Sequence, residues 1–211
     1  MTAEEIGRFV AAAKARNRPT FAHASGTDGV GNAIAGGVDT VEHGFFVTSE
    51  QLARMRDRGT AWVPTFAPVQ AQVDHAAELG WSEAIVAGLR RILDGHAQKL
   101  REAHALGVRI VAGSDAGSSG VPHGTGFLTE LELMERAGMP TLDVLNAATG
   151  VSGGALGMPG PSGRLAPGCL ARFILTAHTL LATVGNLRRP RTVIWDGRAV
   201  EGGPAESFTG L

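Results

Sequence analysis

The sequence contains no tyrosine, a single cysteine and only two lysines, Lys14 and Lys99, among its 211 residues. The lone Cys169 excludes an internal disulfide and a zinc site built from cysteines, and it is consistent with a reducing cytoplasm. Of the 19 basic residues, nearly all are arginine. This usage suggests GC-rich coding, so we expect a bacterial source.

The chain also lacks a strong net charge and any long apolar run. A net charge of −1 gives no reason to expect nucleic acid or a membrane surface as a partner. No stretch is apolar enough over a sufficient length to span a bilayer. The N-terminal segment, with Thr2 and Glu5 at the spacing of a capping box, predicts an amphipathic helix rather than a signal peptide. We therefore expect a cytoplasmic protein.

Short apolar segments alternate with helical patterns over the first three quarters of the chain. We expect strands at 20–24, 39–44, 60–66 and 108–115, and helices at 1–17, 27–37, 48–59, 82–107, 126–138 and 141–157. Such alternation predicts an α/β fold with a parallel sheet. No G-x-G-x-x-G follows a strand, so a dinucleotide-binding fold has no support. Four units of this kind correspond to half a TIM barrel or to a small doubly wound sheet.

Three of the expected strands end on a residue that can bind metal. His23 closes the first, His43 the second and Asp115 the fourth, and small residues follow each of them. In an α/β barrel, side chains from different strand ends converge on one rim. Imidazole and carboxylate groups are ligands for zinc and similar divalent metals. The pattern therefore predicts a metal site.

Each residue taken alone has a simpler interpretation. A single strand histidine is more often a core residue bonded to the backbone, and an aspartate after a strand is often a helix cap. Period-two alternation puts Val41 and His43 on one face of their strand, which would direct His43 into the barrel and Glu42 away from it. The matched placement of all three residues favours the metal site.

The motifs "AHASG", "VEHG" and "GSDAG", in that order, resemble those of the amidohydrolase superfamily, in its imidazolonepropionase-like and metal-dependent dipeptidase-like branch. The segments 123–150 and 156–172 resemble the same branch. The resemblance implies a partial (β/α)8 TIM barrel, with strands five to eight and their helices in residues 1–158. Residues 159–211, with expected strands within 163–178 and 191–200, would be the remnant of a small β-sandwich.

The resemblance also implies roles for particular residues. His23, His43 and Asp115 would bind a divalent metal, most simply zinc, with one or two ions in the complete family site. Asp115 would act as general acid and base in the hydrolysis of an amide, cyclic amide or dipeptide bond. His123, in the loop after Asp115, would contact the small-molecule substrate. We expect no chemistry from His75, His96, His104 and His178.

Two elements of the family pattern are missing. The sequence has no H-x-H pair, and neither lysine lies where the family places a metal-bridging lysine. We therefore expect an incomplete C-terminal half, weak or inactive alone, that is completed by a homo-oligomer or by a second chain supplying the missing half barrel. A non-catalytic remnant or assembly module with weak metal binding stays open, as does a small doubly wound domain whose histidines are incidental.

Overall fold

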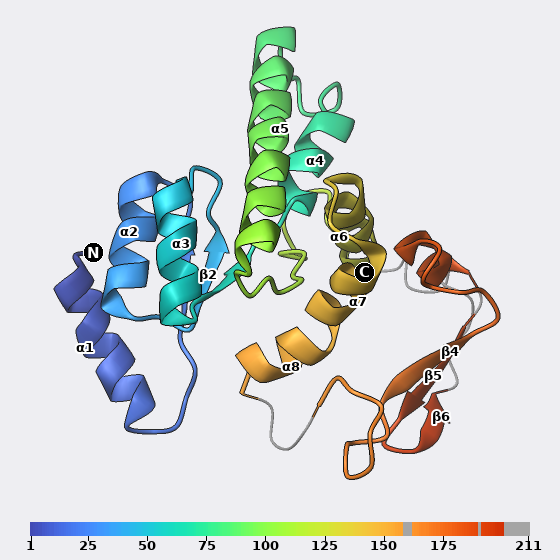
Figure 1. Ribbon diagram of the computed structural model, residues 1–211. Coiled ribbons are helices and arrows are strands. Elements are labelled where there is room, and N and C mark those ends of the chain that lie inside the picture. The colour runs from blue at the N-terminus through green and yellow to red at the C-terminus, as the bar shows by residue number, and fades with distance from the viewer. Residues whose placement is uncertain (158–161, 190, 201–211) are drawn as a thin grey trace.

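The computed structural model describes residues 1–157, 162–189 and 191–200. The first part, residues 1–157, alternates strands and helices. The second part, from residue 162 onward, consists mainly of antiparallel strands (Figure 1). The elements of the first part are α1 (Ala3–Lys14), β1 (Phe21–Ala24), α2 (Thr27–Gly36), β2 (Thr40–His43), α3 (Ser49–Arg58), β3 (Ala61–Val63), α4 (Ala67–Asp74), α5 (Glu83–Leu106), α6 (Thr125–Arg136), α7 (Thr141–Ala148) and α8 (Gly150–Ala155).

The first three strands form a parallel sheet in the order β1-β2-β3. The expected fourth strand is reduced to one parallel bridge between Trp62 and Ile110. Two backbone hydrogen bonds hold it there, from Trp62 N to Arg109 O at 2.8 Å and from Val111 N to Trp62 O at 2.9 Å. The fold is therefore mixed α/β with a partial sheet, and it is not a closed barrel.

Local sequence explains where the helices begin and end. The predicted capping box of α1 is present, and Thr48 with Gln51 forms a second one at the start of α3. Gly37, Gly59 and Gly107 end their helices in the left-handed conformation, which glycine adopts without strain. One expectation was wrong, because the helix expected over 141–157 breaks at Thr149 (φ −129°, ψ −92°) into α7 and α8.

The two faces of the parallel sheet differ in their cover. On the outer face the helices bury Val41 and Trp62 completely, together with Ile34, Leu52 and Leu100. On the inner face, α8 covers Val63 and Val111 through Ala155. Phe21, on β1, is left 76% exposed. The hydrophobic core therefore lies between the sheet and its outer helices.

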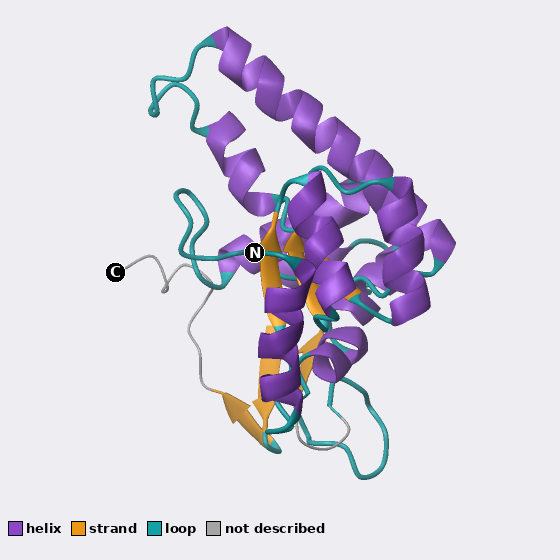
Figure 2. Ribbon diagram, turned by 90° about the vertical axis from the view of Figure 1, so that its left-hand side faces the viewer, coloured by secondary structure: helices purple, strands orange, loops and turns teal. Residues whose placement is uncertain are grey.

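The second part of the chain folds into β4 (Phe173–Thr176), the 3-10 helix η1 (Val184–Arg188), β5 (Arg191–Trp195) and β6 (Arg198–Val200). The three strands lie within the two segments where the sequence predicts strands, and they form an antiparallel sheet. Asp196 and Gly197 form the tight turn between β5 and β6 at positive φ, which the twist of a hairpin favours. Views of the molecule from two sides place this sheet and the long helix α5 at opposite ends (Figures 1 and 2).

The second part is anchored to the first through η1. Val184 and Leu187 are buried in the main core, and Arg188 pairs with Glu132 of α6 at 2.6 Å. The expected boundary between residues 158 and 159 lies outside the described residues, so the two-domain division stays a prediction. None of the described helices is both long and apolar enough to cross a membrane.

Candidate active site

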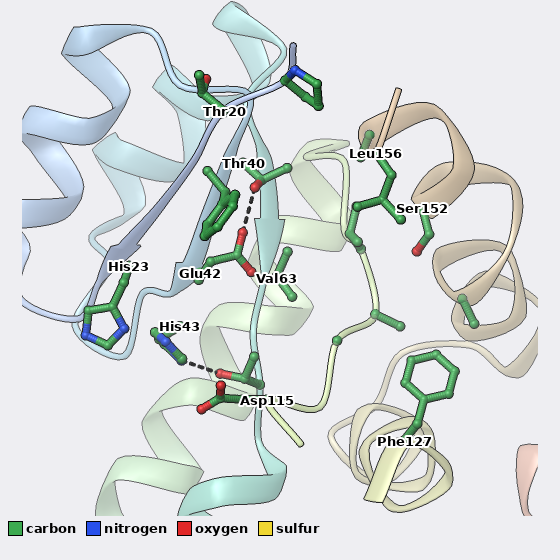
Figure 3. Close-up of a pocket in the computed structure, with 18 residues that line it drawn as sticks. Thr20, His23, Thr40, Glu42, His43, Val63, Asp115, Phe127, Ser152 and Leu156 are labelled. Carbon is green, nitrogen blue, oxygen red and sulfur yellow. Dashed lines mark hydrogen bonds between the residues drawn. The ribbon is translucent and has the colours of Figure 1, made fainter. Parts of the chain in front are cut away.

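A cavity of about 650 Å³ opens along the inner face of the parallel sheet. His23, His43 and Asp115 gather at one end of it, and Thr20, Thr40 and Leu156 lie toward the other (Figure 3). The first end is where the parallel strands finish. The structure thus brings the three predicted residues to one rim of the cavity.

The two histidines lie against each other at this rim. Their ring centroids are 4.4 Å apart, with the rings inclined at 69°. Burial lowers the pKa of His43, and the neighbouring His23 lowers it further, whereas the charge of Asp115 acts in the opposite direction. His43 is therefore neutral near pH 7, which is the form in which imidazole binds a metal.

A hydrogen bond to Thr65 fixes the tautomer of His43. The Nδ1 atom of His43 lies 2.7 Å from Thr65 Oγ1. The Thr65 hydroxyl donates its only proton to the carbonyl of Pro64, at 2.8 Å. In this arrangement Thr65 Oγ1 accepts from Nδ1–H of His43, and the lone pair on Nε2 of His43 is free for a ligand. No pattern in the sequence indicates this role for Thr65.

The face predicted for the second strand was wrong. Val41 is fully buried among the outer helices, whereas Thr40 and Glu42 line the cavity and share a hydrogen bond of 2.6 Å. His43 reaches the cavity only because its backbone turns to φ +69°. Burial raises the pKa of Glu42, the bond from Thr40 lowers it and the charge of Asp115 raises it. Sequence reasoning therefore missed a carboxyl group inside the cavity.

Positive φ angles concentrate at this rim. His43, Thr65 and Asp115, all lining the cavity, have φ of +69°, +54° and +50°. Non-glycine residues adopt such angles at a cost, and they persist where the surrounding structure holds them in place. Gly44, at φ +63°, is also constrained, because a Cβ there would lie 2.8 Å from the indole nitrogen of Trp62.

The remaining histidines lie elsewhere. His123 is exposed and does not line the cavity, so its contact with substrate stays a prediction. His104 pairs with Asp143 at 3.0 Å, and His75 pairs with Glu78. His178 is exposed near Arg189. His96, by contrast, is fully buried beneath the rim.

The chemistry of the three donors suits zinc, but the set is incomplete. Neutral imidazole and carboxylate are typical zinc ligands, and His43 presents a free Nε2. Within the described residues, however, no three histidine, cysteine, aspartate or glutamate groups stand close enough together to hold a metal ion. The histidine pair therefore fits as part of a ligand shell, not as a whole one.

The sequence profile of the amidohydrolase family matches residues 1–200. The chain belongs to this family, as its motifs indicated, and the alternative of a small doubly wound domain does not fit. An uncharacterized protein of Mycobacterium tuberculosis is 30% identical over 88% of this chain and 49% of its own length.

Solved structures agree with this assignment. A Xaa-Pro dipeptidase with methionine in its active site superposes with a TM-score of 0.82 at 30% identity, over 96% of this chain and 49% of that one. The ochratoxinase of Aspergillus niger superposes with a TM-score of 0.81 at 26% identity, over 97% of this chain and 47% of that one. The chain spans about half the length of the relatives that it matches.

Proposed function

We propose that the chain carries one half of the active site of a metal-dependent hydrolase of carbon–nitrogen bonds, in amides, cyclic amides or dipeptides. The observation that carries the proposal is the meeting of His23, His43 and Asp115 at one rim of an open cavity. The names of its relatives, a Xaa-Pro dipeptidase and an ochratoxinase, support this class of reaction.

In this proposal His23 and His43 hold a divalent metal, and Asp115 completes their side of the site. Such a metal, when bound, polarises the scissile carbonyl and makes water more acidic. Asp115 accepts the proton of the attacking water and returns it to the leaving amine. Ser118 donates a hydrogen bond to Asp115 Oδ2 at 2.8 Å and so holds that carboxylate in one orientation. His123 contacts the substrate.

We further propose that another polypeptide segment covers the inner face of the sheet. A barrel interior is normally a packed core, yet the Phe21 side chain is exposed and the cavity beside it is open. The strands would then correspond to strands five to eight, with residues 1–158 in the barrel and 159–211 in a second small domain. That segment would also supply the missing metal ligands.

Complementation tests this function. The zinc-loaded chain is assayed on Pro-containing dipeptides and N-acyl amides, alone and after co-expression with the matching half of a relative. We expect negligible turnover alone, zinc-dependent turnover in the complex, and a loss of most of it in Asp115→Asn. Asp94→Asn, at an exposed position of α5, is the matched control. Substantial hydrolysis by the chain alone, or normal turnover of the Asp115→Asn complex, contradicts the proposal.

A non-catalytic assembly module is the second candidate. The observation in its favour is the absence, within the described ranges, of a group of three side chains able to hold a metal. A complex that forms but shows no turnover with either substrate class would support this candidate.

A further inference from the structure

Glu130 is a fully buried carboxyl group outside the cavity, and the proposed chemistry does not use it. It lies on α6, and both of its oxygens face the start of α4. Oε1 accepts from the backbone N–H of Phe66 at 2.9 Å, and Oε2 accepts from that of Ala67 at 2.7 Å. No side chain of α4's own N-cap residue makes this bond. Glu130 therefore caps α4 from more than 60 residues away in the sequence.

The capped backbone adjoins Thr65, the residue that sets the tautomer of His43. Only Pro64, Thr65 and Phe66 separate the end of β3 from the first residue of α4. Fixing the N–H groups of Phe66 and Ala67 limits the rotation of the chain directly before them. Thr65 needs such a constraint, because its φ of +54° is costly for a β-branched residue.

Two buried aromatic side chains, those of His96 and Trp62, also hold the backbone around Thr65 and His43. His96 of α5 contacts the Pro64 carbonyl through Nε2 at 2.8 Å. Burial lowers the pKa of His96 to about 4, so the ring is neutral and its Nε2–H is the donor. Trp62 donates from Nε1 to the backbone carbonyl of His43 at 2.8 Å. Bonds from β3, α5 and α6 thus hold the His43 carbonyl and the residues on either side of Thr65.

We infer that Glu130 is a positioning residue, which acts through Thr65 to hold His43 in the Nδ1–H tautomer with its Nε2 directed to the cavity. Partners behind a metal-binding histidine commonly fix its tautomer and orientation. Here the support is indirect. The Glu130 carboxyl group on α6 orders the loop that contains Thr65, and the Thr65 hydroxyl then orders the His43 ring. The effect on metal rests on the proposed function, whereas the effect on the tautomer does not.

The test measures the tautomer directly in the full chain. Ring ¹⁵N shifts of labelled histidine, assigned with His43→Asn, report which nitrogen of His43 carries the proton. In wild type we expect the Nδ1–H form. In Glu130→Gln, one amide NH₂ opposes a backbone N–H, so we expect a mixture of tautomers. Glu132→Gln, two residues along the same helix with its partner Arg188 on the surface, should behave as wild type.

Variants at Thr65 complete the test. Thr65→Ser keeps the hydroxyl and should retain the Nδ1–H form, whereas Thr65→Val should lose it. A folded Glu130→Gln protein with a wild-type His43 spectrum overturns the inference. If Glu130→Gln does not fold, Thr65→Val decides the question: an unchanged spectrum overturns the inference, because Thr65 is the proposed link, and a mixed spectrum supports it.

Zinc titration of the same proteins separates this inference from the proposed function. If both hold, Glu130→Gln should bind zinc about tenfold more weakly than wild type and Glu132→Gln. If the tautomer depends on Glu130 but zinc does not change the His43 signals of wild type, the positioning role stands and the metal function fails. Equal zinc affinity in wild type and a Glu130→Gln protein with mixed tautomers would overturn the part of the inference that concerns the metal.

Discussion

The outer and inner faces of the parallel sheet are built from alternate residues of the same short strands, yet they are buried to different degrees. Toward the outer helices, Val41 and Trp62 are completely buried. Toward the cavity, Phe21 is 76% exposed and Glu42 is only partly covered. The outer face therefore supplies most of the buried core, whereas the inner face carries the candidate site beside exposed apolar surface.

This contrast matters because the candidate ligands depend on both faces. His43 looks into the cavity, but its carbonyl is held by Trp62 from the outer core. Its ring is held by Thr65, next to backbone that Glu130 fixes. Contacts from the packed side of the sheet thus hold the residues that face the open side in place. The candidate site can therefore keep its geometry although one face of the sheet is open.

The largest expected effect contrasts one large aromatic residue from each face. Trp62→Ala should lower the free energy of unfolding by ~3–5 kcal/mol, because it empties the centre of the core and leaves the His43 carbonyl without its donor. Phe21→Ala should change it by less than ~0.5 kcal/mol in the isolated chain, since little buried area is lost. Urea unfolding at low protein concentration measures both. Equal losses at the two positions would show that the inner face is also a packed core.

The second effect concerns the buried carboxyl group of Glu130. Burial raises its pKa to about 7, although the N–H groups of Phe66 and Ala67 act to lower it. Because the folded pKa is above the usual value of 4.5, its contribution is fully present below pH 4.5 and is lost as pH rises through about 7. The span corresponds to ~3 kcal/mol at about 1.4 kcal/mol per pKa unit.

Unfolding experiments between pH 4 and pH 8 check this expectation. The stability of wild type relative to Glu130→Gln should fall as pH rises. Glu130→Leu, which also cannot titrate, should give the same pH dependence of the difference with another constant offset. A difference that does not change with pH would mean that Glu130 titrates alike in the folded and unfolded chain.

The third effect concerns metal retention by the histidine pair. After purification with zinc, the chain should retain up to one equivalent, because two imidazole rings meet at the rim. His23→Ala combined with His43→Ala should remove it. His75→Ala combined with His178→Ala serves as the control, because neither histidine lines the cavity. Equal zinc in wild type and the first double variant, measured by elemental analysis, would disprove the ligand assignment.

The sequence predicted the elements of the fold that short-range patterns determine. Capping residues and glycines located α1, α2 and α3, and the ends of the parallel strands located His23, His43 and Asp115. It failed where one backbone angle decides the outcome. Period-two alternation put His43 on the face of Val41, and a φ of +69° reverses that result.

Long-range support of the site was equally hidden. Glu130 lies in an ordinary helical pattern 63 and 64 residues away from the N–H groups that it binds, and nothing in its neighbourhood marks it as buried. Thr65 follows a strand like many loop threonines. The roles inferred for Glu130 and Thr65 both depend on the contact between Thr65 and His43 in the folded chain. Neither role could be found from spacing or composition.

The smallest expected effect concerns association through the inner face. Exposed apolar surface at a sheet edge favours pairing with other chains, so we expect the isolated chain to be oligomeric. Phe21→Ser removes an aromatic side chain of the cavity wall that is 76% exposed and should weaken self-association about tenfold, equivalent to about 1.4 kcal/mol. Leu142→Ser, at a 56% exposed position of α7, should have no such effect. Light scattering over a concentration series measures both variants. A wild-type chain that is monomeric throughout the series would show that the inner face does not associate, and equal weakening by the two variants would place the contact elsewhere on the surface.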